Sequence, residues 1–466
     1  ILRQKQDLEH IMTRYKQIGQ SLKQRGAYWM TRAGEIMDRY PIHILGVIVL
    51  FGLLLSTTII LADPPSMESG STDSWWVISL NLIHGRGYSL CIPRYFPFCE
   101  IGNQTTAARE PVPVLLFAMV AKLSNESLWA ATAFELLIYL SVLICVYLLT
   151  LEWANRRAAL IATFLWTIYL PAVDLIPQVS GDLLGTFFVT FGMLFVLRAR
   201  RTNRVKDWVI AGAGLGLGIL SRSAILTIPA ILMGGLIVER WRQGRNLLDI
   251  IKPSLILFGA ASLIMLPWIV RNQISLGRPL LGSSLVGYNI FRQSYALTTD
   301  NYLHFIDGVD GKIAVQELLV ERKKDLSGME NEAQMDVIYK AEAIKIIRSH
   351  PFKYMLSSGY RFFLLWFNWQ IPEGYLYLAT RRDYVIMAMQ AVLMIFAWIG
   401  VRKGNFFRTW PLWGSLVIIS LAYMAVESQL RFLIPVMPLL MSLSAVGINK
   451  LFMDQSPDTF KGMVVA

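Results

Sequence analysis

The chain has few charged residues, few histidines and few cysteines. Charged residues make up 16% of its 466 residues, whereas soluble globular proteins carry about a quarter. Apolar residues make up 55%, and the mean hydropathy is +0.47. This composition excludes an ordinary soluble enzyme and indicates a polytopic membrane protein.

The formal net charge of +12 is the one feature that is also typical of nucleic-acid-binding proteins. The Lys and Arg residues, however, lie in short blocks between apolar runs and not on one continuous basic surface. We therefore predict no nucleic-acid partner, and we assign the basic blocks to the edge of a membrane.

The five histidines show no ligand spacing such as HxxxH, so we predict no zinc site built from histidines. Of the three cysteines, Cys145 lies inside an apolar run, whereas Cys91 and Cys99 share one polar loop. If that loop lies outside the cytoplasm, Cys91 and Cys99 form a disulfide; the alternative is two unrelated thiols.

Apolar runs of helical length recur along the chain, and about 20 residues are needed to cross a bilayer as an α-helix. The sequence predicts spanning helices over 43–62, 127–150, 157–174, 181–198, 207–221, 223–239, 248–269, 385–401, 409–426 and 430–449. Two further stretches, 112–122 and 354–369, are marginal.

Dense basic blocks separate these runs, and the positive-inside rule places all of them in the cytoplasm. The blocks are EWANRR (152–157), RARRTNRVK (198–206), ERWRQGR (239–245) and VRKGNFFR (401–408). An even number of crossings must lie between successive cytoplasmic blocks. The stretches 112–122 and 354–369 therefore do not cross alone, and we expect interfacial helices or re-entrant hairpins there.

This threading divides the chain into five parts. They are a cytoplasmic juxtamembrane segment 1–42, a transmembrane core 43–270 with the outer loop 63–126, an outer segment 271–384, C-terminal transmembrane helices 385–450 and a cytoplasmic tail 451–466. The first segment predicts an amphipathic helix on the membrane surface, with a partner-binding helix as the alternative. The outer segment predicts a small α-rich domain, with IDGVDGK (306–312) as a turn and a helix that ends before Pro351.

The conspicuous charged residues near the ends of the spans all fall on the outer side. They are Asp73, Arg109, Glu110, Asp182, Arg222, Arg271 and Arg431. Charges that only flank helices would lie at both interfaces, so this distribution predicts an outer-face active site. The structural alternatives are helix N-caps for the two aspartates and ion pairs such as Arg431 with Glu427 or Arg109 with Glu110.

Several motifs in a fixed order carry a resemblance to a known family. They are Asp73 with HGRGY (84–88), REPVP (109–113), RRAALIATFLW (156–166), QVSGDLL (178–184), LSRSAILTIPAIL (220–232), PWIVRNQISLGRPLLGS (267–283), GYNIF (287–291), IIRSHPFKYM (346–355) and ESQLRFLIPVMPLL (427–440). With these motifs the chain resembles lipid-phosphate-sugar-dependent glycosyltransferases of the GT-C membrane fold. The group includes aminoarabinose transferases and protein O-mannosyltransferases.

The resemblance implies an all-α polytopic membrane protein, a GT-C type bundle of about 10–13 helices with outer loops that form a small α-rich domain. It implies a polyprenyl-phosphate sugar as donor, a lipid, glycan or protein acceptor, and an inverting transfer on the periplasmic face of a bacterial inner membrane, with a cytoplasmic N-terminus. No cofactor is required, and a divalent metal near Asp73 is the alternative.

The resemblance also implies residue roles. Asp73 inherits the role of general base, although Ser74 stands where many relatives have a second acidic residue, and Asp182 orients the acceptor or the base. The expected ligands of the donor phosphate are Arg271, Arg109, Arg222 and Arg431. The expected contacts of the sugar or acceptor are Glu110, Trp75, Trp76, Tyr88 and Glu427.

Two other function classes compete with a transferase. A transporter or flippase of lipid-linked glycans usually shows repeat symmetry and charges near the bilayer midplane, neither of which the sequence has. A polysaccharide polymerase or ligase shares the outer arginines but lacks the pattern around Asp73.

Overall fold

The structure is a computed structural model that describes residues 32–67, 72–93, 95–99, 105–303, 308–367 and 381–453, with the backbone alone at 72, 73 and 308–310. Within these ranges the only β structure is an isolated bridge between Ser89 and Thr105, so the all-α prediction is confirmed. The N-terminal amphipathic segment lies outside the described residues except for its helical end at 32–39, and so does the tail beyond 453.

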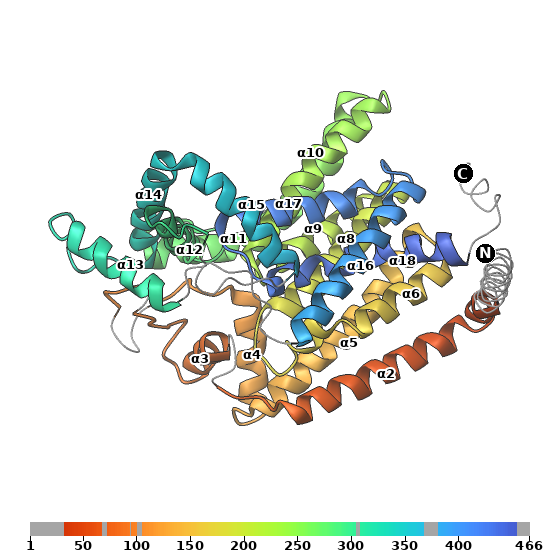
Figure 1. The fold of residues 1–466 in the computed structure, drawn as a ribbon, viewed down its shortest axis with the longest axis horizontal. Coiled ribbons are helices and arrows are strands. Elements are labelled where there is room, and N and C mark those ends of the chain that lie inside the picture. The colour runs from red at the N-terminus through yellow and green to blue at the C-terminus, as the bar shows by residue number, and fades with distance from the viewer. Residues whose placement is uncertain are drawn as a thin grey trace, which may run out of the picture.

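The helices follow one another as in Figure 1. They are α2 (Pro41–Ala62), α3 (Thr72–Ile83), α4 (Pro111–Leu123), α5 (Leu128–Trp153), α6 (Arg156–Thr167), α7 (Leu170–Val173), α8 (Asp182–Thr202), α9 (Val205–Ile219), η1 (Ser223–Leu226), α10 (Thr227–Arg242), α11 (Leu247–Leu276), α12 (Val286–Tyr295), η2 (Ala296–Thr298), α13 (Gly308–Glu321), α14 (Glu332–Ser349), α15 (Pro351–Phe367), α16 (Arg381–Lys403), α17 (Trp410–Val426), η3 (Leu430–Val436) and α18 (Met437–Phe452).

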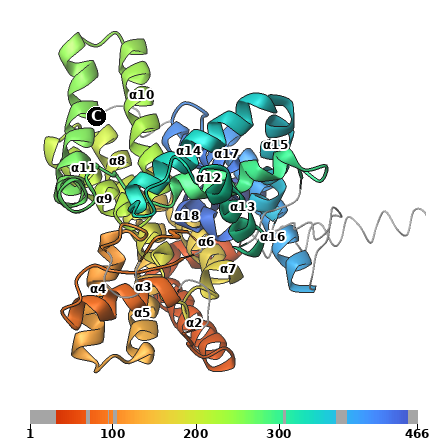
Figure 2. The ribbon, with the colours of Figure 1, turned by 90° about the vertical axis from the view of Figure 1, so that its left-hand side faces the viewer.

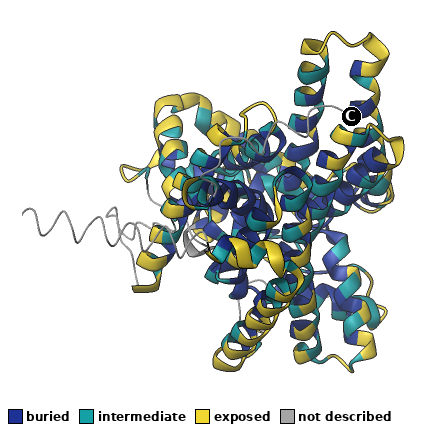
Figure 3. Cartoon of the chain, turned by 90° about the vertical axis from the view of Figure 1, so that its right-hand side faces the viewer, coloured by how far each residue is buried: buried dark blue, intermediate teal, exposed yellow. Residues whose placement is uncertain are grey.

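Seven helical stretches among the described residues are long and apolar enough to cross a membrane, and they coincide with predicted spans. They are α2, α5, α8, η1 with α10, α11, α16, and η3 with α18. Many large apolar side chains on the outside of these helices are exposed, for example Val47 of α2 and Leu263 of α11, which suits contact with lipid tails. Figure 3 shows the buried residues inside the bundle, and Figure 2 shows α10 and α11 as a hairpin that projects from it.

The predicted span 157–174 is broken in the structure. Helix α6 ends at Thr167, and the short helix α7 with Pro171 follows. Proline has no N–H and disrupts the backbone ladder, which frees carbonyl groups. The Thr167 carbonyl accepts a hydrogen bond from the buried Tyr139 hydroxyl at 3.0 Å, so the break costs no unsatisfied group there.

The basic blocks that the sequence assigns to the cytoplasm meet at one end of the bundle. Arg157 pairs with Asp38 at 2.5 Å, Arg201 with Glu152 at 2.7 Å and Arg200 with Glu239 at 2.7 Å. Arg200 also donates to the Arg408 carbonyl at 2.9 Å. All four blocks are thus joined, which supports the predicted parity of the crossings.

At the opposite end, helices α12, α13 and α14 form the expected small outer domain (left in Figure 1) with a separate apolar core. Phe96 from the first outer loop packs into this core beside Tyr288 and Tyr339. Helix α14 ends at Ser349, before Pro351, as predicted. The expected turn at 306–312 is wrong for its described part, because α13 already begins at Gly308.

The described part of the marginal stretch 354–369 lies in helix α15, which packs against the C-terminal end of α17. The Tyr354 hydroxyl donates to the Ala425 carbonyl at 2.7 Å, and Trp366 donates to Ser420 Oγ at 3.1 Å. The two acceptors lie five residues apart on α17, which is about 7.5 Å at 1.5 Å per residue. Helix α15 contacts the C-terminal end of α17 through these two bonds and does not pack along the whole length of α17.

The crossing of α16 and α18 depends on a glycine, and this predicts a stability effect. A Cβ added at Gly447 would lie 2.0 Å from the Phe396 carbonyl oxygen. Small residues permit such close helix contacts in membranes. We expect Gly447→Ala to destabilise the folded protein by about 1–3 kcal/mol, seen as a lower melting temperature in detergent. Gly259→Ala is the control, since a Cβ there meets nothing within 4 Å; equal melting of both variants would contradict the contact.

Candidate functional site

A cavity of about 570 Å³ lies between the outer domain and the outer ends of the transmembrane helices. Its charged lining residues are Arg109, Glu110, Arg222, Arg292, Lys340, Glu427 and Arg431. Apolar residues complete the wall, among them Leu226 and Val426 at the ends of η1 and α17, and Leu280 and Leu281 between α11 and α12. Five basic side chains against two acidic ones, next to an apolar wall, are suited to a ligand that has an anionic head and an apolar tail.

The segment before α4 places Arg109 and Glu110 in the cavity wall. The Arg109 Nε donates to Ser74 Oγ at 2.8 Å, and the guanidinium carbon lies 4.3 Å from the Trp75 ring centroid. Glu110 accepts from both the Ser223 amide, at 2.8 Å, and the Ser223 hydroxyl, at 2.5 Å. The two neighbouring charges therefore contact different partners, and the predicted alternative of an Arg109–Glu110 ion pair is wrong.

Arg222 is held by Asp182 directly beneath the cavity. Its Nε lies 3.0 Å from Asp182 Oδ1, and Asp182 is fully buried. The chain at Ser221 approaches the start of α8 so closely that a Cβ on Gly181 would lie 2.4 Å from the Ser221 carbonyl oxygen. Asp182 is the first residue of α8 and Gly181 is the N-cap, so the N-cap interpretation of Asp182 is wrong. Asp182 orients Arg222 and does not itself line the cavity.

Glu427 lines the cavity, but its partner is Arg292 of α12 and not Arg431, as the sequence-based alternative proposed. The ion pair joins the outer domain to the segment between α17 and η3, and both side chains are largely buried. Gln429 donates to the same carboxylate at 3.2 Å. Arg431 lies on the cavity wall beside Phe432, with 5.5 Å between its guanidinium carbon and the ring centroid.

Arg271, the expected main phosphate ligand, lies next to the cavity but does not line it. Its guanidinium donates to the Thr106 carbonyl at 2.7 Å, to Asn272 Oδ1 at 2.9 Å and to the Tyr88 carbonyl at 3.3 Å. The Tyr88 hydroxyl in turn donates to the Arg109 carbonyl at 2.9 Å. Burial raises the pKa of Tyr88, so this hydroxyl keeps its proton. Both residues tie the first outer loop to α11.

Helix α3 brings the sequence around Asp73 to the cavity. Trp75 lines the cavity beneath Arg109, whereas Trp76 is buried in a cluster with residues of α4. Trp76 is not among the residues that line the cavity, and its contact with a substrate stays a prediction. Asp73 lies in the first turn of α3, two residues before Trp75, and its side chain lies outside the described atoms. Its role as base stays a prediction.

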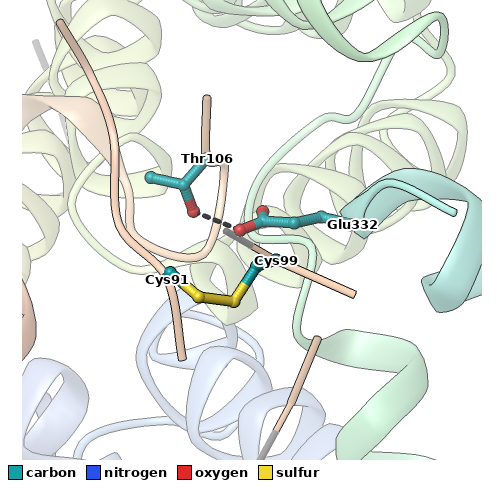
Figure 4. Close-up of a disulfide and its surroundings, with 4 residues drawn as sticks. All are labelled: Cys91, Cys99, Thr106 and Glu332. Atoms are coloured by element: carbon teal, nitrogen blue, oxygen red, sulfur yellow. Dashed lines mark hydrogen bonds between the residues drawn. A yellow bond between two sulfur atoms is a disulfide. The ribbon is translucent and has the colours of Figure 1, made fainter. Parts of the chain in front are cut away.

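The structure joins Cys91 and Cys99 in a disulfide, with 5.5 Å between their Cα atoms (Figure 4). The loop that it closes carries Tyr95, which lines the cavity, and Phe96, which is buried in the outer domain. The Tyr95 carbonyl accepts a hydrogen bond from the Tyr339 hydroxyl at 2.8 Å. The disulfide thus fixes a loop that contributes to the cavity wall.

Three charged residues of this region were missed from the sequence. Arg292 and Lys340 lie in the outer domain, where no charge pattern singles them out, and only the fold brings them to the cavity. Glu135 is fully buried in α5, and its Oε1 accepts from the Ser180 amide at 3.2 Å. A carboxyl inside a long apolar run was a usable signal, because intramembrane charges usually mark functional regions.

Among the cavity arginines, Arg109 lies in an environment that disfavours its positive charge. Burial lowers the pKa of Arg109, and the nearby positive charges of Arg431 and Arg222 lower it further, against the opposing influence of Tyr95 and Glu110. A bound anion would relieve both effects. Among the described residues no three His, Cys, Asp or Glu side chains are grouped to hold a metal ion. Since the Asp73 side chain is not among them, a metal at that residue stays a prediction.

Comparison with known proteins agrees with this architecture. Residues 108–270, which include Arg109, Asp182 and Arg222, match the model of the dolichyl-phosphate-mannose-protein mannosyltransferase family. No curated protein matches the chain. Two similar solved structures are of the oligosaccharyltransferase from the archaeon Archaeoglobus fulgidus.

The first holds a tethered acceptor peptide; it has 18% identity and a TM-score of 0.53, over 90% of this chain and 50% of that one. The second, AglB with an inhibitory peptide and a dolichol-phosphate, has 19% identity and a TM-score of 0.53, over 89% and 51%. The chain thus spans about half the length of these structures, and the likeness shows the fold. The chain is a polytopic membrane protein with a GT-C type fold, and its residues 108–270 match the model of the dolichyl-phosphate-mannose-protein mannosyltransferase family.

Proposed function

We propose that the protein is a membrane glycosyltransferase that moves a sugar from a polyprenyl-phosphate donor to an acceptor hydroxyl. The observation that carries this proposal is the cavity in which Arg109, Arg222 and Arg431 lie beside an apolar wall. Guanidinium groups bind phosphate oxygens through two parallel hydrogen bonds, which makes arginine the preferred phosphate ligand. The apolar wall suits the first isoprene units of the lipid.

The cavity arginines support a revised place for the donor phosphate. Arg109, Arg222 and Arg431 point to the cavity wall from three different segments, whereas Arg271 bonds to backbone carbonyls outside the lining. We infer that the phosphate contacts the cavity arginines, and that Arg271 acts through the loop that it holds. The AglB structure with dolichol-phosphate is a precedent for a lipid phosphate in this fold.

The proposed reaction is a single displacement with inversion. Asp73 removes the proton of the acceptor hydroxyl as that oxygen attacks the anomeric carbon. The bond from the anomeric carbon to the phosphate oxygen breaks, and the electron pair leaves with the polyprenyl phosphate. The arginines stabilise the negative charge that grows on this leaving group. The position of Asp73 two residues before Trp75 supports this assignment.

The outer-domain wall of the cavity suits the acceptor. Tyr95, Asn289 and Lys340 line it, and the ion pair of Arg292 with Glu427 borders it. We propose sugar or acceptor contacts for Trp75, Glu110 and Glu427. The reaction takes place on the outer, periplasmic face, and the Cys91–Cys99 disulfide supports this, since disulfides persist in oxidising compartments.

A substitution of the proposed base is the first test. We expect Asp73→Asn to lower the rate of sugar transfer from polyprenyl-phosphate donors by about 10²- to 10⁴-fold, with an unchanged affinity for undecaprenyl phosphate. The control is Asp63→Asn, which changes an exposed acid at the end of α2. Transfer at the wild-type rate by a folded Asp73→Asn protein would show that Asp73 is not the base. Activity that disappears with a chelator and returns with a divalent ion would assign Asp73 to a metal site instead.

The arginines give a second test, which measures binding alone. We expect Arg109→Ala and Arg431→Ala to weaken binding of undecaprenyl phosphate by about 10-fold or more, since a hydrogen bond to a charged group contributes about 1.5–3 kcal/mol. Arg271→Ala should weaken binding less and lower the melting temperature more. Arg86→Ala, an exposed arginine outside the cavity, is the control. If Arg271→Ala abolishes binding while Arg431→Ala does not, the phosphate lies outside the cavity.

A further inference from the structure

One buried carboxylate of the outer domain contacts the first outer loop. Glu332, in the first turn of α14, is 1% exposed. Its Oε1 accepts from the Thr106 hydroxyl at 2.5 Å (Figure 4). Its Oε2 accepts from the Ala107 amide at 2.8 Å and from the Ser284 hydroxyl at 2.7 Å. Three segments far apart in the sequence therefore meet at one side chain.

The segment that Glu332 holds leads directly to the cavity. Thr106 and Ala107 stand two or three residues before Arg109, and Ser284 donates its own amide to the Ala107 carbonyl at 2.9 Å. The residue before it, Ser283, donates its hydroxyl to the Ala108 carbonyl at 2.8 Å, and its amide donates to Ser223 Oγ at 2.9 Å. Ser223 is the residue that binds Glu110. A continuous chain of hydrogen bonds thus runs from Glu332 to the cavity wall.

The same face of α14 reaches the cavity in the middle of the helix, at Lys340. Residues four apart share one face of a helix, and Glu332 is followed by Asp336 and Lys340. Asp336 accepts from the Gly287 amide at 2.6 Å and pairs with Lys340 at 2.5 Å. Lys340 lines the cavity. This stripe connects the outer-domain wall of the cavity to the segment that carries Arg109.

We propose that Glu332 is a positioning residue for the transfer reaction, because it fixes the segment 106–110, which presents Arg109 to the donor phosphate and carries Glu110 in the cavity wall. The proposal rests on the proposed function only for the identity of the ligand. Under this proposal the outer domain is part of the site, and α14 determines the position of Arg109 through Glu332.

The donors around Glu332 predict which substitutions are tolerated. The Ala107 amide can only donate, so an oxygen must stand at the Oε2 position, whereas the Thr106 hydroxyl can also accept a hydrogen bond. Gln satisfies this set, with its carbonyl facing Ala107 and Ser284 and its amide facing Thr106. Ala leaves all three donors without this partner, and an unmet buried group carries the full desolvation cost.

Amide hydrogen exchange and lipid binding together test the proposal. We expect Glu332→Ala to speed exchange in a peptide that covers 105–110, by on the order of 10-fold or more, and to weaken binding of undecaprenyl phosphate by a similar factor. Glu332→Gln should resemble the wild type in both. The matched control is Glu330→Ala, because that half-buried acid bonds only within 327–330 among the described residues. If Glu332→Ala does not fold, Ser284→Ala removes one donor and should give a smaller change in the same direction.

The outcomes separate this proposal from the proposed function. Faster exchange with unchanged lipid binding and unchanged transfer would show that order in 106–110 does not matter to the site, and would overturn the proposal. Unchanged exchange in Glu332→Ala would overturn it as well. A wild-type protein that binds no undecaprenyl phosphate would contradict the proposed function, and the exchange result would still decide whether Glu332 orders the segment.

Discussion

The ion pair between Arg222 and Asp182 is the interaction on which the site depends. A guanidinium group that leaves water inside a membrane protein needs a partner, and loss of one member of a buried pair costs about 3–5 kcal/mol. This pair fixes the turn between α9 and η1 against the start of α8. The turn carries Ser223, which in turn holds Glu110. The end of the first outer loop, at Glu110, is therefore fixed by contacts that lead to the buried ion pair.

The cavity is held from two directions. The transmembrane side supplies Arg222 and Arg431, and the outer domain supplies Arg292 and Lys340. Between them lies the short segment 106–110, which has no regular structure and is fixed by hydrogen bonds to its neighbours. A phosphate site needs its cations close together despite their repulsion. The surrounding carboxylates and backbone contacts supply the rigidity that such a cluster requires.

The sequence was sufficient for seven of the ten predicted spans, as far as the described residues show, and for the end of the bundle at which the basic blocks meet. Apolar runs mark most of the long helices, and the basic blocks that were assigned to one side are joined by ion pairs such as Arg157 with Asp38. The break at Pro171 was missed because the apolar run continues through it. The remaining differences concern side chains whose partners are set by the tertiary fold. Trp76 packs in a cluster with residues of α4 and does not line the cavity, and Arg271 bonds to carbonyls that belong to loop residues far away in the sequence.

The same limit applies to the members of the cavity wall. Arg109 and Arg431 were expected because they sit near the ends of apolar segments, where a charge is noticeable. Lys340 and Arg292 sit in a polar helical domain, where charge is ordinary, and their place depends on how α12 and α14 pack. Contacts such as Glu332 with Ala107 join residues far apart in the sequence, and no periodicity predicts them.

The central claim is that the cavity arginines hold the phosphate of a polyprenyl carrier. A structure of the protein in lipid nanodiscs with undecaprenyl phosphate tests it most directly. The account predicts phosphate density within hydrogen-bond distance of Arg109 and Arg431, with the first isoprene units against Leu226 and Val426. Density at Arg271 outside the cavity, or a cavity that stays empty at saturating lipid, would contradict the account.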